Sequence, residues 1–269
     1  VKLTGDERNR LKTTGTNIPE AYDYVLRSRE QLRLTSKDGN ARAQALLNRA
    51  IELDPGYATA HAHLATARFM NYINRWSETA DPSLEYAYEL AQKAVALDGT
   101  DPTAHHVMGT ICLWKRQHDQ AIAELERSIA LEPNRAYTFG VLGNALQYAG
   151  RPEEALEWIN RGMRLDPSYS DSRLHFLALA TFQLGRYEDA AEVLRRRIIL
   201  KPDTDISRVL LAACYGHLGL TDEAKIQWAE VFRINPDYSV ERHMKNLPYK
   251  DPANTDRIVG GLRKAGLVE

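Results

Sequence analysis

The sequence predicts an all-α protein built from repeated pairs of helices. Three ten-residue segments are close variants of one pattern: GRPEEALEWI at 150–159, GRYEDAAEVL at 185–194 and GLTDEAKIQW at 219–228. Apolar residues recur in them at the three- and four-residue spacing of a helix that buries one face. A 269-residue chain that repeats such a unit is expected to stack equivalent units rather than to surround one central core.

A fixed period separates the units. One alanine after the turn of each unit recurs at intervals of 34, 35 and 34 residues, and a proline, which stops a helix, follows each alanine by twelve residues. Upstream of each alanine lies a second segment with helical spacing (MGTICLW, LGNALQY, FLALATF and LLAACYG), so each unit contains two antiparallel helices. The alanines are Ala121, Ala155, Ala190 and Ala224, and the prolines are Pro133, Pro167, Pro202 and Pro236.

This unit resembles the tetratricopeptide repeat. The Leu-Gly pair of that family appears as Leu142-Gly143, whereas Arg116 departs from the family's turn glycine. A glycine inside a helix costs about 1 kcal/mol relative to alanine, so Gly143 indicates a close approach of two helices, with Ala155 at the same crossing. The resemblance implies an α-solenoid, a right-handed superhelix of antiparallel helix pairs. The turn glycine is present at Gly150, Gly185 and Gly219.

Six repeats are expected within residues 20–238. The second repeat carries an insertion at 70–84, because its alanine, Ala87, comes ten residues late. Residues 1–19 are expected to link the repeats to an upstream domain, and 239–269 to cap the last repeat with a short helix. The expected repeats are 20–57, 58–101, 102–135, 136–169, 171–204 and 205–238.

The composition argues against several classes of partner. A net charge of -1 provides no broad attraction to nucleic acid or to an anionic membrane. No stretch approaches the roughly 18 apolar residues of a spanning helix. The two cysteines, Cys112 and Cys214, are too few for a disulfide framework, which favours a cytoplasmic location. Both stand at apolar helix positions, so they are expected to be buried and not nucleophilic.

Catalytic chemistry is not expected in this chain, and neither a metal nor another cofactor is predicted. His61 and His63 do not share a helix face, nor do His105 and His106, and no further ligands complete a tetrahedral set. The carboxylates of PEEALE, YEDAAE and TDEAK stand in the first turn of a helix, where they complement the helix dipole. The basic run at 195–197 is expected to form a solvated helix face.

The resemblance also implies a concave groove lined by the first helix of each repeat. The positions carried onto this sequence hold aromatic, amide and imidazole groups and lack Lys, Arg, Asp and Glu, which suits a protein or peptide segment. Two alternatives stay open: the aromatic residues only cover the inner wall, or a chain end of this protein fills the groove. The candidate partner-binding residues are His106, Thr110, Trp114, Tyr137, Asn144, Gln147, Tyr148, His175, Phe182, Gln183 and His217.

The two ends of the chain carry a second resemblance. The tail segments PYKDP and GLRKAGL, with NIPEAYDYVLRSREQLR near the start, are similar to the C-terminal repeat region of bacterial class III adenylate or guanylate cyclase-like proteins. This implies a non-catalytic scaffold that regulates a larger signalling protein, because the catalytic aspartates of such cyclases need a mixed sheet, which no pattern here predicts. A homodimerisation module of that parent, or the repeat region of a bacterial transcriptional regulator, are the alternatives.

Overall fold

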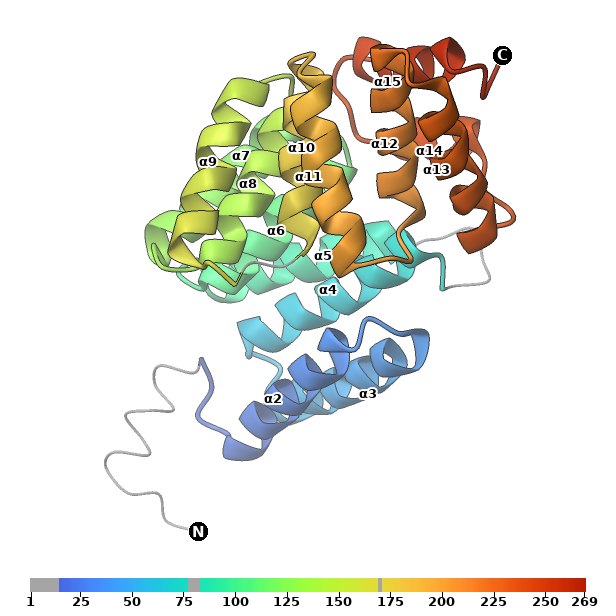
Figure 1. Cartoon of the computed structure of the whole chain (residues 1–269). Coiled ribbons are helices and arrows are strands. Elements are labelled where there is room, and N and C mark those ends of the chain that lie inside the picture. Colours follow the sequence, from blue (N-terminus) through green and yellow to red (C-terminus); the bar gives the residue numbers. More distant parts are fainter. Residues whose placement is uncertain (1–14, 77–82, 169–170) are drawn as a thin grey trace. The chain divides into compact units, whose positions relative to one another are not determined.

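Helices are the regular secondary structure of the part of the chain that the structure describes. This computed structural model describes residues 15–76, 83–168 and 171–269, and within them it contains fourteen α-helices and no strand (Figure 1). The predicted fold class, an all-α solenoid of helix pairs, is confirmed.

The chain divides into two compact units. The first contains the described residues up to 115 together with 123–133, and the second contains 116–122 and 134–269. The helices of the first unit are α2 (Pro19–Arg33), α3 (Lys37–Leu53), α4 (Ala58–Asn74), α5 (Ser83–Leu97) and α6 (Pro102–Trp114). Helix α7 (His118–Leu131) contributes residues to both units. The helices of the second unit are α8 (Ala136–Tyr148), α9 (Pro152–Leu165), α10 (Asp171–Gln183), α11 (Tyr187–Leu200), α12 (Asp205–Leu218), α13 (Thr221–Ile234), α14 (Val240–Asn246) and α15 (Ala253–Lys264).

Within each unit, helices pack first on their partner and then on the next pair. In the second unit α8 packs on α9, α10 on α11 and α12 on α13, while α9 contacts α10 and α11 contacts α12. In the first unit α2 packs on α3 and α4 on α5, and α3 contacts α4. An amphipathic pair buries only part of its apolar surface, so the next pair is needed to complete the core.

Small residues allow the close helix crossing that the sequence predicts. Ala155 is 0 % exposed at the junction of α8 and α9. A Cβ added to Gly143 would lie 2.8 Å from the Ala155 carbonyl oxygen and would overlap the side chain of Ile159. The compensating reason inferred for this helical glycine is therefore confirmed. Ala121, Ala190 and Ala224 are likewise 0 % exposed.

The turn between α6 and α7 has an arginine where the equivalent turns have a glycine. Gly150, Gly185 and Gly219 end their helices with φ values of 86°, 74° and 75°, and Arg116 adopts the same left-handed conformation with φ 60°. This conformation costs a non-glycine residue roughly 1–2 kcal/mol. A contact made by the Arg116 side chain is expected to offset that cost.

The insertion at 70–84 is partly a longer helix. Helix α4 has 17 residues, compared with 13 in α6, and it ends at Asn74 in a left-handed residue, Arg75. The rest of the insertion includes residues 77–82, which lie outside the described residues. Helix α5 then begins at Ser83.

Two of the histidines that suggest a metal site instead hold turns. In three repeats the fourth residue of the first helix donates a hydrogen bond to a carbonyl six residues earlier, in the preceding turn. These bonds join His61 to Pro55 (3.0 Å), His105 to Gly99 (3.0 Å) and Arg208 to Pro202 (3.2 Å). A cationic or imidazole donor here satisfies a loop carbonyl that would otherwise lack a partner.

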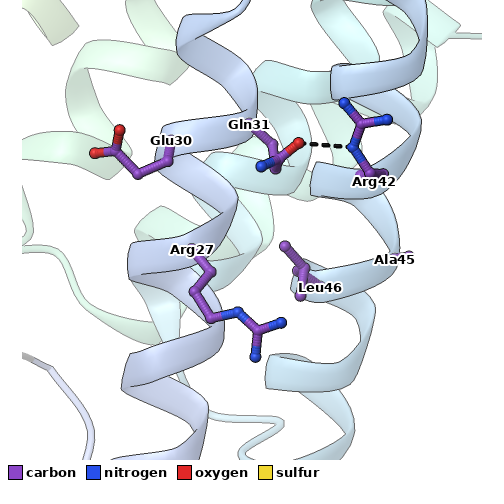
Figure 2. A pocket seen from close by; sticks show the side chains of 6 residues that line it. All are labelled: Arg27, Glu30, Gln31, Arg42, Ala45 and Leu46. Atoms are coloured by element: carbon purple, nitrogen blue, oxygen red, sulfur yellow. Dashed lines mark hydrogen bonds between the residues drawn. The ribbon is translucent and has the colours of Figure 1, made fainter.

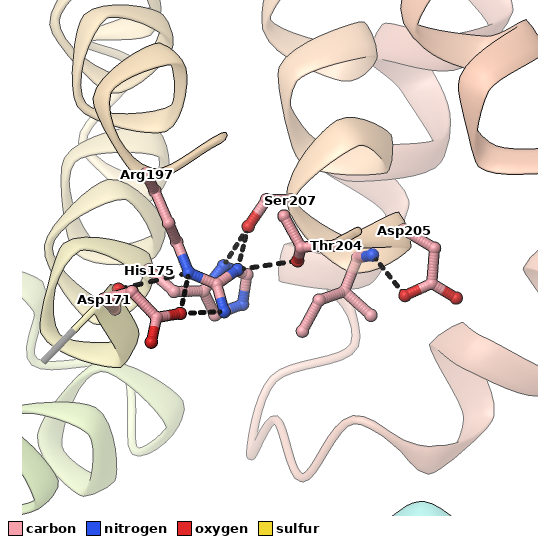
Figure 3. Close-up of polar contacts among 7 residues, drawn as sticks. Asp171, His175, Arg197, Thr204, Asp205 and Ser207 are labelled. Atoms are coloured by element: carbon pink, nitrogen blue, oxygen red, sulfur yellow. Dashed lines mark hydrogen bonds and ion pairs between the residues drawn. The ribbon is translucent and has the colours of Figure 1, made fainter. Parts of the chain in front are cut away.

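Arg197 corrects one sequence prediction. The run 195–197 is not a uniformly solvated face, because Arg197 is only 5 % exposed whereas its two neighbours are exposed. Its guanidinium pairs with Asp171 of α10 (Nη2 to Oδ2, 3.0 Å) and donates to the Thr204 hydroxyl (2.9 Å) and to Ser207 of α12 (Figure 3). One buried cation thus joins α10, α11 and α12, and its partners satisfy most of its donors.

We expect the α8–α9 crossing to reject even one methyl group. Gly143→Ala should lower the free energy of unfolding by about 1–3 kcal/mol through overpacking. Gly260→Ala is the matched control, because an added Cβ meets no atom within 4 Å and should stabilise α15 by up to about 1 kcal/mol. Urea titration followed by circular dichroism measures both, and equal stability of the two variants would contradict the crossing geometry.

Candidate functional site

Three of the predicted groove residues lie on α6 in the first unit. The Trp114 ring is partly exposed and packs near Phe69 and Tyr72, with ring centroids 6.1 and 6.4 Å away. The Thr110 hydroxyl donates to the His106 carbonyl at 2.9 Å. This part of the proposed groove therefore presents a partly exposed aromatic cluster.

Four more predicted residues lie on α8 in the second unit. Asn144, Gln147 and Tyr148 are 7 %, 0 % and 4 % exposed, and the Gln147 amide donates to Asn144 Oδ1 at 3.1 Å. Tyr137, near the other end of the helix, is 46 % exposed. The C-terminal half of α8 is thus covered, although its side chains were expected to face a partner.

The remaining predicted residues lie on α10 and α12. Phe182 is 1 % exposed, and its ring lies 5.7 Å from the His217 ring. Tyr187 stacks in parallel on His217 with centroids 4.2 Å apart. Gln183 is 7 % exposed, and Nδ1 of His175, which is partly buried, lies 3.2 Å from the Ser207 hydroxyl.

The C-terminal tail contacts Tyr148, Gln183 and His217 of this set. Tyr249 is 4 % exposed, and its ring meets the Tyr148 ring edge-to-face with centroids 4.7 Å apart. The Lys250 amide donates to the Tyr148 carbonyl at 2.9 Å, which satisfies one of the carbonyls left free at the end of α8. Burial raises the pKa of the Tyr249 hydroxyl well above its ordinary value.

Two side chains of the α6–α7 turn hold the backbone of the same tail segment. Arg116 uses both terminal nitrogens of its guanidinium, and His118, which is 7 % exposed, uses Nε2–H. The acceptors are the carbonyls of Lys245 (2.9 Å), Leu247 (3.0 Å) and Tyr249 (3.0 Å) for Arg116 and of Pro248 (2.6 Å) for His118. Arg116, which stands where the family has a turn glycine, thus supplies side-chain hydrogen-bond donors that a glycine lacks.

Helix α15 closes the other end of the tail against α12. A Cβ on Gly216 would overlap the backbone of Gly261, so the two helices cross at glycines. His217 Nε2–H donates to the Arg257 carbonyl at 2.9 Å, and the Arg257 guanidinium donates to the Gln183 carbonyl at the end of α10. The tail therefore satisfies backbone carbonyls at the ends of two successive first helices.

In the second unit, the C-terminal tail covers part of the predicted groove. Tyr148, Gln183 and His217 contact the chain's own tail. Arg116, His118 and Tyr249 also belong to this site, although none of them was predicted from the sequence. One signal was available: an arginine in place of a turn glycine needs a compensating contact. The tail's return to that arginine depends on a separation of 129–133 residues and has no local signal.

A separate pocket of about 400 Å³ lies between α2 and α3 in the first unit (Figure 2). Of the lining residues, Arg42 donates from Nε–H to the Gln31 side-chain oxygen at 2.7 Å, which links α3 to α2. No residue predicted for the groove contributes to it. The pocket is lined by Arg27, Glu30, Gln31, Arg42, Ala45 and Leu46.

The described residues contain no assembled metal-binding cluster. No cluster of three or more His, Cys, Asp or Glu side chains there could hold a metal ion, and no described helix is long and apolar enough to cross a bilayer. Cys112 and Cys214 are both free and 0 % exposed, as predicted. Burial raises the pKa of the Cys112 thiol to about 12, so its reactive thiolate form is suppressed.

Comparison with known proteins agrees with this architecture. Residues 115–170 and 177–239 match the family model described as tetratricopeptide repeat. These are tetratricopeptide repeats. A solved structure of similar fold, the APC/C hetero-tetramer Cut9-Hcn1, aligns with a TM-score of 0.69 at 16% identity, covering 95% of this chain and 46% of that one.

Two curated relatives share this repeat sequence. A putative adenylate cyclase 3 of Rhizobium meliloti is 40% identical over 267 residues, which covers 99% of this chain and 45% of that protein. A peroxisomal targeting signal receptor of Candida glabrata is 25% identical over 140 residues, covering 45% of this chain and 24% of the receptor. The chain spans less than half the length of these relatives.

We expect Arg116→Gly to destabilise the protein although glycine suits its backbone. Glycine relieves roughly 1–2 kcal/mol of left-handed strain, but three hydrogen bonds worth about 0.5–1.5 kcal/mol each are lost, for a net loss of about 1 kcal/mol. Arg75→Gly is the control, because Arg75 is exposed with φ 51° and its replacement should stabilise. Thermal melts compare them, and stabilisation by Arg116→Gly would contradict the clamp.

We expect the repeats to lose stability in mild acid through His175. Burial, together with the charges of Arg197 and His243, holds the pKa of His175 well below 6.5, so the folded chain keeps it neutral. Below about pH 6.5 the unfolded chain binds a proton at this histidine and the folded chain does not. The free energy of unfolding, unaffected by His175 above that pH, therefore falls by up to about 1.4 kcal/mol per pH unit as the pH is lowered. His175→Gln should flatten the drop in melting temperature between pH 7.5 and 5.0; an unchanged drop would contradict it.

Proposed function

We propose that this chain is a non-catalytic interaction scaffold that forms the regulatory region of a larger signalling protein similar to a nucleotide cyclase. Tetratricopeptide repeats mediate protein–protein interaction, and the fold is generally non-catalytic. The proposal of a cyclase-like parent protein is supported by the 40% identity to the putative adenylate cyclase. This similarity extends over 99% of this chain but only 45% of that relative. The remainder of such a protein leaves room for a separate catalytic domain.

The aromatic cluster of the first unit is the proposed contact surface for a partner. Trp114 is flanked by Phe69 and Tyr72, and all three side chains are partly exposed. Aromatic side chains supply large contact areas at a small entropic cost and often dominate interface energies. A protein segment with apolar side chains and free backbone groups fits this surface.

The scaffold is favoured over dimerisation through the tail helix. The apolar residues Ile258 and Leu262 of α15 are 2 % and 0 % exposed, because the helix packs on α12 of the same chain. A symmetric contact between two copies would need that apolar face to be free. The tail therefore has a role within one chain before any role between chains.

We expect Trp114→Ala to separate binding from folding. In a longer protein that joins this chain to a cyclase domain, loss of a central aromatic contact should weaken partner affinity by about 30-fold, since such residues contribute about 2 kcal/mol. The partner's effect on the rate of cyclic nucleotide formation should weaken in parallel, while the melting temperature changes little. Tyr86→Ala, at a tyrosine that is 41% exposed on α5, is the control.

Two results would contradict this proposal. An unchanged partner response in Trp114→Ala would remove the aromatic cluster from the interface. Turnover of ATP or GTP by the purified 269-residue chain, measured with Mg²⁺ or Mn²⁺ present, would show that the chain itself is catalytic.

A further inference from the structure

The tail segment 245–250 is bound in the manner of a peptide ligand. Its backbone presents four carbonyls to Arg116 and His118, and its Lys250 amide donates to the end of α8. Its one deeply buried aromatic side chain, Tyr249, packs on Tyr148. A backbone clamp combined with a single side-chain pocket is a common way to recognise an extended peptide.

We propose that residues 245–250 are a resident ligand, and that the surface beneath them binds a segment of another protein with the same chemistry. That segment is an extended peptide with a proline-tyrosine pair and free carbonyls before and at the tyrosine. This inference rests on the proposed function, since it names the kind of partner that the repeats accept. The tail keeps the surface closed until such a segment replaces it.

Recognition by the clamp is independent of side-chain sequence. Arg116 and His118 contact only carbonyl oxygens, which every residue carries, at the C-terminal end of α14 and in the residues that follow it. Specificity comes from the pocket that holds Tyr249 beside Tyr148. The proline at 248 keeps the segment extended before the tyrosine and leaves its own carbonyl for His118.

The pocket fits the tail imperfectly. Both amide atoms of Gln183 lack a hydrogen-bond partner although the residue is only 7 % exposed, and the Gln147 oxygen is also unpartnered. The Gln183 side chain lies close enough to the Tyr249 hydroxyl to lower its pKa, but the geometry falls short of a well-formed hydrogen bond. Buried polar groups without partners cost about 1–3 kcal/mol each. A partner segment that supplies the missing bonds would therefore bind more tightly than the tail does.

The tail can open without losing its anchor. Helix α14 has no buried residue, whereas Ile258, Leu262 and Ala265 of α15 are 2 %, 0 % and 1 % exposed against the second unit. The segment between α13 and α15 can therefore leave its site while α15 stays in place. Because both ends of this segment remain attached, it competes with any partner at an effective concentration in the millimolar range.

The probe is a fluorescein-labelled synthetic peptide with the sequence of residues 245–252, KNLPYKDP, and fluorescence anisotropy measures its binding to the 269-residue protein. The Tyr249→Ala substitution weakens the attachment of the resident segment to its site. The variant protein should therefore bind the probe at least about 10-fold more tightly than the wild type. Adding Arg116→Gly to that variant should abolish the increase in affinity for the probe, because the backbone clamp is lost. Tyr86→Ala, which leaves the tail intact, should behave as the wild type.

Absence of binding to Tyr249→Ala at millimolar peptide would overturn the proposal. Hydrogen exchange of the wild type keeps the test decisive if that variant does not fold. The proposal expects the Lys250 amide to exchange at least about 10-fold faster than the protected amides of α15, and equal protection would show that the tail is one permanent cap. Failure here leaves the Trp114 experiment unaffected, so the two proposals fail separately.

Light scattering distinguishes the source of the segment. The proposal expects the wild type to remain monomeric at all concentrations, because each resident tail occupies its own site. A concentration-dependent dimer that the peptide dissociates would show that a second copy supplies the segment by exchange of tails, and would overturn the assignment to another protein.

Discussion

The close crossing of paired helices is the constraint on which the rest of the structure depends. Gly143 and Ala155 bring α8 and α9 together at a distance that excludes a further methyl group. An isolated pair still leaves apolar surface exposed, so the next pair must stack on it. Within each unit, this stacking sets the direction of the first helices and thereby determines which of their side chains share one surface.

Helix ends connect the stack to the tail. Each first helix finishes with carbonyls that have no partner within the helix, and at Tyr148 and Gln183 these groups accept hydrogen bonds from the tail. Arg116 acts in the opposite sense by donating to tail carbonyls from a turn where the related repeats have glycine. The tail is therefore held mainly through backbone groups.

Buried polar residues link neighbouring repeats. Arg197 contacts Asp171 and Ser207, so three helices share one cation (Figure 3). Replacing such a pair by apolar residues often costs little, whereas removing one partner leaves a buried charge unpaired. His61 and His105 act on a smaller scale by holding the turn before their own helix.

The sequence by itself determined the helix pairs, their period and the buried alanines, because these depend on a local spacing that recurs from repeat to repeat. It also marked Arg116 as an exception, and it predicted a short helix within the tail at 239–269. Only the tertiary structure decided that Arg197 is buried and that Tyr249 occupies the surface beside Tyr148. These contacts join residues that are 7 to 133 positions apart, and no periodic pattern encodes which carbonyl a distant guanidinium will meet.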